Sequence, residues 1–196
     1  MNPSAERRAL IGSYFCHEYS VEAAALFNPS IVKHPDQSSL TDGALRFVMS
    51  LRAVGEGHIS SIEFRTGVVY PGGCIDITPP KKPLREPVCS ISRPGEKVIM
   101  TRKVRGSGRL VESDSVVAFD TGTELSQRVL FPFMACQRNG IEDARFMEFR
   151  DEEGKRIFYA TYTAYDGKHI RPKLLSTEDF RTFRFMSLLG SGVKNK

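Results

Sequence analysis

Short segments in which apolar and polar residues alternate occupy most of this chain. Residues 45–53 (Leu-Arg-Phe-Val-Met-Ser-Leu-Arg-Ala) and 59–66 (Ile-Ser-Ser-Ile-Glu-Phe-Arg-Thr) are typical, and residues 25–32 open the series. β-Branched and aromatic residues that recur at a period of two indicate half-buried β-strands, and little helix is expected between them. The pattern therefore predicts an all-β protein.

A second series of strands follows later in the chain, at residues 143–149, 156–164, 172–177 and 181–186. Each series begins with a polar residue at the entrance of its first strand, Asn28 in one and Asp143 in the other. Repetition of one antiparallel meander is typical of a β-propeller, whose blades hold about four strands, with the first along the central channel. Sandwiches and barrels of short strands give similar patterns and stay open as alternatives. In a propeller, both polar residues would face the channel.

Two short helices are expected before the first strand. Ser4 fits as the cap of a helix over residues 4–11, and the alanine-rich residues 20–26 fit a second helix. We therefore expect residues 1–26 to form a helical segment that packs on the first blade or contacts another subunit of a homo-oligomer. Residues 27–196 are expected to form the β-domain.

Composition indicates a globular domain, because 40% of the 196 residues are hydrophobic. No run of about 18 apolar residues is present, and residues 1–8 lack the apolar stretch of a secretory signal. We therefore expect a cytoplasmic protein with no membrane partner. The cysteines are far apart, with no Cys-x-x-Cys motif, at Cys16, Cys74, Cys89 and Cys136. This spacing favours reduced thiols over disulfides or zinc ligands, and no metal site is expected.

The net charge of +5 admits negatively charged partners but selects none of them. Acidic residues interrupt the basic ones, and no aromatic RNA-binding motif is present, so nucleic acid is not an expected partner. Residues 105–109 (Arg-Gly-Ser-Gly-Arg) are not followed by the Gly-Lys-Ser/Thr of a phosphate-binding loop. A hairpin loop is the better interpretation of that stretch.

The candidate chemistry lies in residues 139–146, Asn-Gly-Ile-Glu-Asp-Ala-Arg-Phe. The Asn-Gly turn delivers two adjacent carboxylates, Glu142 and Asp143, to the mouth of a strand, and Arg145 follows on the alternation. Neighbouring side chains of a strand point to opposite faces, so the two carboxylates are a poor acid and base pair. One of them can serve as an acid catalyst while the other is structural. A solvated turn is the alternative interpretation.

Several segments, including this one, resemble glycoside hydrolase family 130: residues 23–32 (Ala-Ala-Ala-Leu-Phe-Asn-Pro-Ser-Ile-Val), 50–53, 55–62, 139–146, 159–167 and 194–196. The resemblance spans nearly the whole chain and is weakest between residues 70 and 126. It implies a five-bladed β-propeller with a sugar site at the central channel. Family members continue past the segment that matches residues 194–196, so an incomplete propeller of about two to three blades is expected, at about 40–45 residues per blade.

The resemblance implies a mannoside phosphorylase, a hexosyltransferase that cleaves β-mannosidic bonds with inorganic phosphate by an inverting mechanism. Asp143 matches the general acid, which in the family acts through a sugar hydroxyl as proton relay, and Glu142 would support it. Asn28 and Arg52 match residues that hold hydroxyl groups of the mannosyl unit.

Three further basic residues are candidates for the same site. Arg65 and Arg145 are candidate sugar-site residues, with strand arginines in salt bridges as the alternative for both. By resemblance, Lys196 matches a lysine of the phosphate-binding group. The expected partners are a mannose-containing oligosaccharide and inorganic phosphate as co-substrate, with no other cofactor.

Other functions stay open at this stage. A phosphorylase needs no catalytic base, because phosphate is itself the nucleophile and is held by Arg, Lys or hydroxyl donors. An inverting β-mannoside hydrolase needs a second carboxylate about 6.5–9.5 Å from the acid. A catalytically incomplete carbohydrate-binding fragment, or an interaction module that completes its ring with another copy or another polypeptide, are the alternatives outside enzymology.

Overall fold

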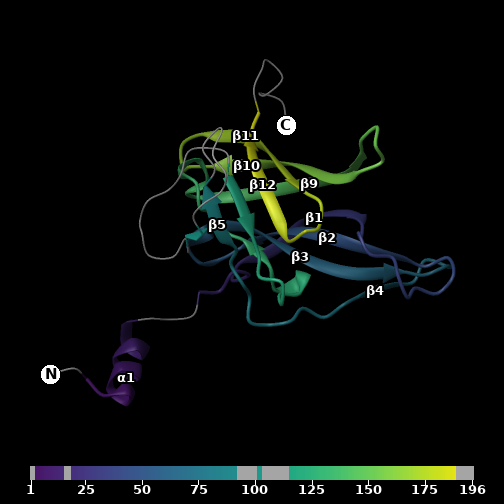
Figure 1. Cartoon of the computed structure of the whole chain (residues 1–196). Coiled ribbons are helices and arrows are strands. Elements are labelled where there is room, and N and C mark those ends of the chain that lie inside the picture. Colours follow the sequence, from purple (N-terminus) through teal and green to yellow (C-terminus); the bar gives the residue numbers. More distant parts are fainter. Residues whose placement is uncertain (1–2, 16–18, 92–100, 103–114, 189–196) are drawn as a thin grey trace.

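The computed structural model describes residues 3–15, 19–91, 101–102 and 115–188 (Figure 1). These residues form one α-helix, α1 (Ala5–Phe15), and strands that belong to one sheet. The strands are β1 (Ala25–Lys33), β2 (Leu45–Val54), β3 (Ser60–Val69), β4 (Ile75–Ile77), β5 (Val88–Ile91), β6 (Thr101–Arg102), β7 (Ser115–Ala118), β8 (Val129–Leu130), β9 (Gly140–Arg150), β10 (Arg156–Tyr165), β11 (Ile170–Thr177) and β12 (Thr182–Ser187). Single 3₁₀ turns occupy Glu56–His58, Leu125–Gln127 and Ala135–Gln137. The prediction of an all-β fold is confirmed.

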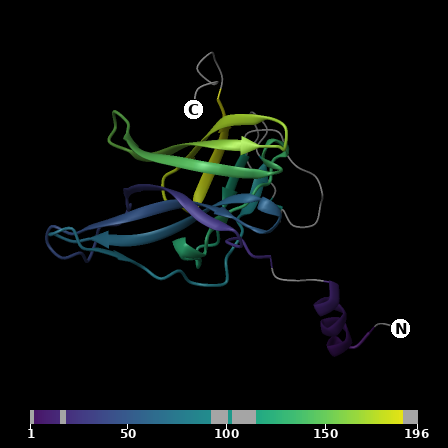
Figure 2. The ribbon, with the colours of Figure 1, turned by 180° about the vertical axis from the view of Figure 1, so that it is seen from behind.

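Two antiparallel meanders make up most of the sheet. The first meander is β1–β2–β3, with β4 and β8 paired to β3, and the second meander is β9–β10–β11–β12, which β7, β5 and β6 extend. The two are joined through one parallel pair, Ser60 on β3 with Gly140 on β9. Figures 1 and 2 show the second meander, in green and yellow, lying over the first, in purple and blue. The arrangement is one mixed sheet, and its assignment to a propeller stays a prediction.

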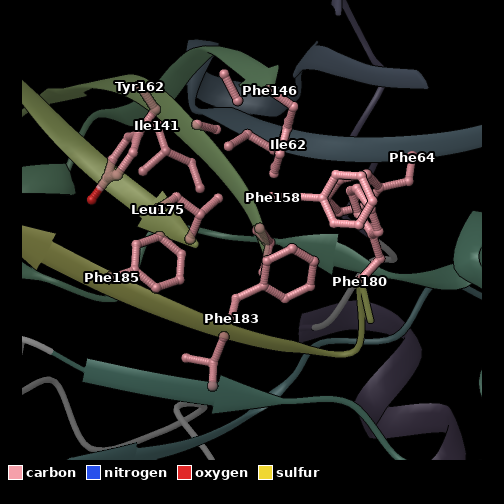
Figure 3. Close-up of a cluster of buried hydrophobic side chains, with 14 of the residues drawn as sticks. Ile62, Phe64, Ile141, Phe146, Phe158, Tyr162, Leu175, Phe180, Phe183 and Phe185 are labelled. Atoms are coloured by element: carbon pink, nitrogen blue, oxygen red, sulfur yellow. The ribbon is translucent and has the colours of Figure 1, made fainter. Parts of the chain in front are cut away.

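Aromatic side chains from both meanders form the core between them (Figure 3). Phe64 of β3 stacks on Phe183 of β12, with ring centroids 5.5 Å apart and an angle of 20° between the planes. Phe180, in the turn before β12, contacts Phe64 at 5.9 Å and Phe158 of β10 at 4.8 Å. All four side chains are buried, and each contributes about 1.5–3 kcal/mol through burial alone. The alternation of the sequence places the rings of Phe64, Phe158 and Phe183 on the inner face of each meander.

The N-terminal region differs from the expectation. Helix α1 has no buried residue and extends away from the sheet, so its predicted packing on the β-region is not observed (Figures 1 and 2). The second predicted helix, over residues 20–26, is wrong: a turn occupies residues 21–24 and β1 begins at Ala25. Alanine has the highest helix propensity of all residues, but the free energy of this preference is small. The Ala24 N–H is instead bonded to the Val54 carbonyl of the sheet. Within the described residues, no helix has the length and apolar character needed to cross a bilayer.

We predict that Phe64→Ala destabilises the protein by about 3–5 kcal/mol, because it opens a cavity between the two meanders. Urea unfolding followed by circular dichroism measures the loss. Phe149→Ala is the matched control, since this β9 side chain is 49% exposed and should cost less than about 1 kcal/mol. Equal losses for the two variants would contradict the proposed role of Phe64 in joining the meanders.

Candidate functional site

The first strand of each meander contains a residue with left-handed backbone conformation. Asn28 of β1 has φ 53° and Asp143 of β9 has φ 52°. Each residue lies at a register shift of its strand pair, where two residues of one strand oppose one residue of the other, which is the geometry of a β-bulge. Apart from glycine, Asn and Asp are the residues that adopt this conformation most readily. The left-handed backbone conformation therefore explains why an Asn or Asp residue occupies each strand entrance.

The two bulges lie against each other. The backbone N–H of Phe146 donates to Ser30 Oγ at 2.9 Å, and Arg145 Nη1 donates to the Pro29 carbonyl at 2.7 Å. On the neighbouring strand β2, Ser50 Oγ donates to the Ala144 carbonyl at 3.4 Å. These bonds hold the start of β1 beside the start of β9.

Four predicted site residues meet at this junction. Asn28 Nδ2 donates to Asp143 Oδ1 at 2.5 Å, across a separation of 115 residues in the chain. Arg52, from β2, contacts both carboxylates, with Nη2 at 2.7 Å from Glu142 Oε1 and Nη1 at 3.7 Å from Asp143 Oδ1. The side chains of Arg52, Glu142 and Asp143 are 22%, 20% and 31% exposed, so the cluster is partly accessible to solvent. We call Asn28, Arg52, Glu142 and Asp143 the junction cluster.

Ser60 also belongs to this place and was missed by sequence reasoning. Arg52 Nε donates to Ser60 Oγ at 3.0 Å, and Ser60 Oγ lies 3.5 Å from Glu142 Oε1. Gly140 allows this approach, because a Cβ atom there would lie 2.9 Å from the Ser60 Cβ. Ser60 is buried and orients Arg52 and Glu142 without reaching the surface. No sequence pattern marks it, since its role depends on the register between β2, β3 and β9.

The remaining basic candidates lie outside the junction cluster. Arg145 is exposed, and its guanidinium ties β9 to the Pro29 carbonyl beside the cluster. Arg65 is buried on the face of β3 opposite to Ser60 and pairs with Glu63 and Glu22, which corresponds to the salt-bridge alternative. Lys196, the predicted phosphate ligand, lies outside the described residues, as does the glycine-containing stretch 105–109.

The chemistry of the junction cluster is that of polar recognition. It offers two carboxylates, one guanidinium and one amide, a set that exchanges hydrogen bonds with hydroxyl groups in several directions. In the part of the chain that the structure describes, no three His, Cys, Asp or Glu side chains are grouped as ligands for a metal ion. Cys74 is an exposed free thiol and Cys136 a buried one, whereas the side chains of Cys16 and Cys89 are not described.

Comparisons with known proteins do not identify a family. No protein-family model matches the chain, and searches of curated proteins and of solved structures found no match. The resemblance to glycoside hydrolase family 130 therefore stays a prediction.

We predict that Asn28→Ala is less stable than Asn28→Gly by about 1–2 kcal/mol. Both variants lose the hydrogen bond to Asp143, but only alanine pays the cost of the left-handed conformation. Thermal and urea unfolding of the two variants measure the difference. Equal stability would show that the bulge relaxes to another backbone conformation when the side chain is removed.

Proposed function

We propose that this protein is a carbohydrate-active enzyme of the mannoside phosphorylase type, with Asp143 as general acid. The observation that carries the proposal is the convergence of Asn28, Arg52, Glu142 and Asp143 at one junction. The sequence resemblance assigns these same residues to a sugar site, although they come from three strands and two distant parts of the chain. A shared sugar site requires that these four residues lie close together, and in the structure they contact one another.

The arrangement of the meanders supports a propeller-type architecture for the proposed enzyme. In a propeller, the first strand of every blade lines the central channel, so the first strands of adjacent blades are neighbours. Here β1 and β9 are the first strands of successive meanders, and they meet at their bulges through Ser30 and Arg145. Each bulge presents its polar residue at that meeting point.

The proposed reaction is an inverting phosphorolysis. Phosphate attacks the anomeric carbon of a β-mannoside, a new bond to a phosphate oxygen forms, and the glycosidic bond breaks on the opposite face. The departing oxygen takes its proton from Asp143, relayed by a sugar hydroxyl, and the products are an α-mannosyl phosphate and the shortened saccharide. Asn28 and Arg52 would orient Asp143 and exchange hydrogen bonds with the sugar.

Phosphorolysis is favoured over hydrolysis by the state of Glu142. An inverting hydrolase needs a second carboxylate that is available to activate water. Glu142 is instead engaged by Arg52 at 2.7 Å and lies 3.5 Å from Ser60 Oγ, which fits a supporting role. A phosphorylase needs an acid but no base, together with Arg, Lys or hydroxyl donors that hold the phosphate. In this proposal Asp143 supplies the acid, and Lys196 is the candidate phosphate ligand.

A carbohydrate-binding protein without turnover is the second candidate. The observation that favours it is that every member of the junction cluster already has a polar partner within the cluster. Such a pre-arranged set of donors and acceptors binds hydroxyl groups whether or not a proton is transferred.

We predict that Asp143→Asn lowers turnover about 10²–10⁴-fold, since the amide cannot donate an acidic proton, while mannose affinity stays within about tenfold. Asparagine tolerates the left-handed backbone and retains an oxygen for the Asn28 amide. The assay follows formation of mannosyl phosphate from a panel of β-linked mannose disaccharides with inorganic phosphate, and calorimetry measures mannose binding.

Asp42→Asn, at an exposed turn position, is the control and should leave both quantities unchanged. Unchanged turnover in Asp143→Asn would remove Asp143 as the acid. Sugar release that does not require phosphate would identify a hydrolase, and saturable binding with no turnover by the wild-type protein would identify the carbohydrate-binding alternative.

A further inference from the structure

A second polar cluster lies on the other face of β3. Ser61, Glu63 and Arg65 alternate along the strand and point away from the aromatic core that contains Phe64. Glu63 is completely buried and Arg65 is 6% exposed. This cluster takes no part in the proposed reaction, so its burial needs another explanation.

Arg65 joins two carboxylates from different parts of the chain. Its Nη1 donates to Glu63 Oε2 at 3.0 Å, and its Nη2 donates to Glu22 Oε1 at 2.5 Å. Glu22 belongs to residues 19–24, the segment immediately before β1. One guanidinium thus serves two carboxylates, and one negative charge remains uncompensated within the cluster.

A proton shared by the two carboxylates removes this excess charge. An uncompensated buried charge is expensive, and a buried carboxyl group avoids the cost by staying protonated. The two carboxyl groups interact with each other as well as with Arg65. Glu63 Oε1 receives no hydrogen bond from an N–H or hydroxyl donor of the described residues, so an ionised Glu63 lacks the compensation that a proton shared with Glu22 supplies.

The pKa shifts of the two carboxyl groups agree with this charge count. Burial, followed by the hydrogen bond and the charge of Glu22, raises the pKa of Glu63 to about 7. The pKa of Glu22 is lowered, chiefly by its hydrogen bond with Glu63 and also by the charges of Arg65 and Lys82. On the adjacent strands, Leu51 and Val129 face Glu63 in the register, and neither side chain titrates.

We propose that Glu22, Glu63 and Arg65 form a proton-dependent clasp that holds residues 19–24, and with them the start of β1, against the sheet. The clasp is closed when the two carboxylates share one proton. Loss of that proton leaves two negative charges on one guanidinium, and Glu22, which is the partly exposed member, moves away. This proposal does not depend on the proposed enzymatic function.

The segment that the clasp holds is also attached by neutral contacts. Tyr19 Oη donates to the Glu56 carbonyl at 2.8 Å, and the Ala24 N–H donates to the Val54 carbonyl at 2.9 Å. The Tyr19 ring packs edge-on against Phe131, with centroids 5.4 Å apart. Two bonds between Ser20 and Glu56 add to them: the Glu56 N–H donates to the Ser20 carbonyl at 3.1 Å, and the Ser20 N–H donates to Glu56 Oε1 at 3.4 Å. All of these contacts belong to a short segment that precedes an edge strand of the sheet, so an opening of residues 19–24 costs far less than global unfolding. Strand β1, which contains Asn28, follows this segment directly in the sequence.

The direction of the pH effect follows from the two pKa shifts. The folded pKa of Glu63 lies above its value in the open segment, so its contribution is complete below about pH 4.5 and is lost as pH rises through about 7. The lowered pKa of Glu22 acts in the opposite direction, and its contribution is lost as pH falls below its ordinary value of 4.5. The clasp is therefore tightest near pH 4.5. It weakens progressively as pH rises from there to about 7, and the contribution of Glu63 is lost above that pH.

Amide hydrogen exchange by NMR tests the proposal on the full chain. With rates corrected for the intrinsic pH dependence of exchange, protection of the Ala24 amide should fall about tenfold between pH 6 and pH 8. At pH 6, one unit below the pKa of about 7, the bound proton favours the closed clasp by about that factor, and at pH 8 this contribution is lost. In Glu63→Gln, whose amide imitates the protonated acid and donates to Glu22, protection should be the same at both pH values. Glu148→Gln is the matched control: this β9 carboxylate pairs with Arg150 on the second meander, and the variant should retain the wild-type pH dependence.

Two results would overturn the clasp: protection of Ala24 that does not change between pH 6 and pH 8 in the wild-type protein, or a wild-type pH dependence in Glu63→Gln. If Glu63→Gln does not fold, the carboxyl ¹³C resonance of Glu63 in the wild-type protein decides. A titration midpoint near 7 supports the clasp, and a midpoint below about 5 contradicts it, since that is the range of an ordinary glutamate.

Discussion

Burial of aromatic rings between the two meanders is the interaction on which the rest of this structure depends. The sheet continues from the first meander to the second through a single parallel residue pair, Ser60 with Gly140, which is too little to fix their relative position. The stacked rings of Phe64 and Phe183 supply the attraction, but apolar burial has no direction of its own. Register comes from Gly140, where the absence of a side chain lets β9 approach Ser60 closely. Together, the core and this close approach bring Glu142 within reach of Arg52.

The junction cluster shows how backbone and side-chain demands can select the same residues. A left-handed conformation costs most residues about 1–2 kcal/mol, and Asn and Asp are favoured wherever glycine is not used. At positions 28 and 143 these residues also form the hydrogen bond that links the two bulges. Backbone geometry alone would be satisfied by glycine at both places. Backbone geometry therefore does not explain why an amide lies opposite a carboxylate at these positions. The proposed sugar site rests on this pair of side chains.

Local periodicity predicted most of the strands, because alternation is a property of a few consecutive residues. Strands β2, β3 and β10 begin and end within three residues of the predicted ranges. The failure at residues 20–26 has the opposite cause: the preference of alanine for helix is local and small, whereas the bonds of Ala24 to Val54 and of Glu22 to Arg65 are not local. Ser60 and Glu63 carried no recognisable pattern either. Their roles follow from partners 82 and 41 residues away, which only the register of the folded sheet brings near.

Strand β3 carries a different polar cluster on each face, and the two are connected through β1. One face places Ser60 under Arg52 in the junction cluster, and the other places Glu63 and Arg65 under Glu22. Residues 19–24 lead directly into β1. The closed clasp and the correct position of Asn28 therefore both require that the start of β1 is ordered. Coupling between two sites through one shared element is reciprocal. A ligand that binds better when Asn28 is fixed must therefore also favour the protonated pair of Glu22 and Glu63, and the proton on that pair must favour the ligand by the same factor.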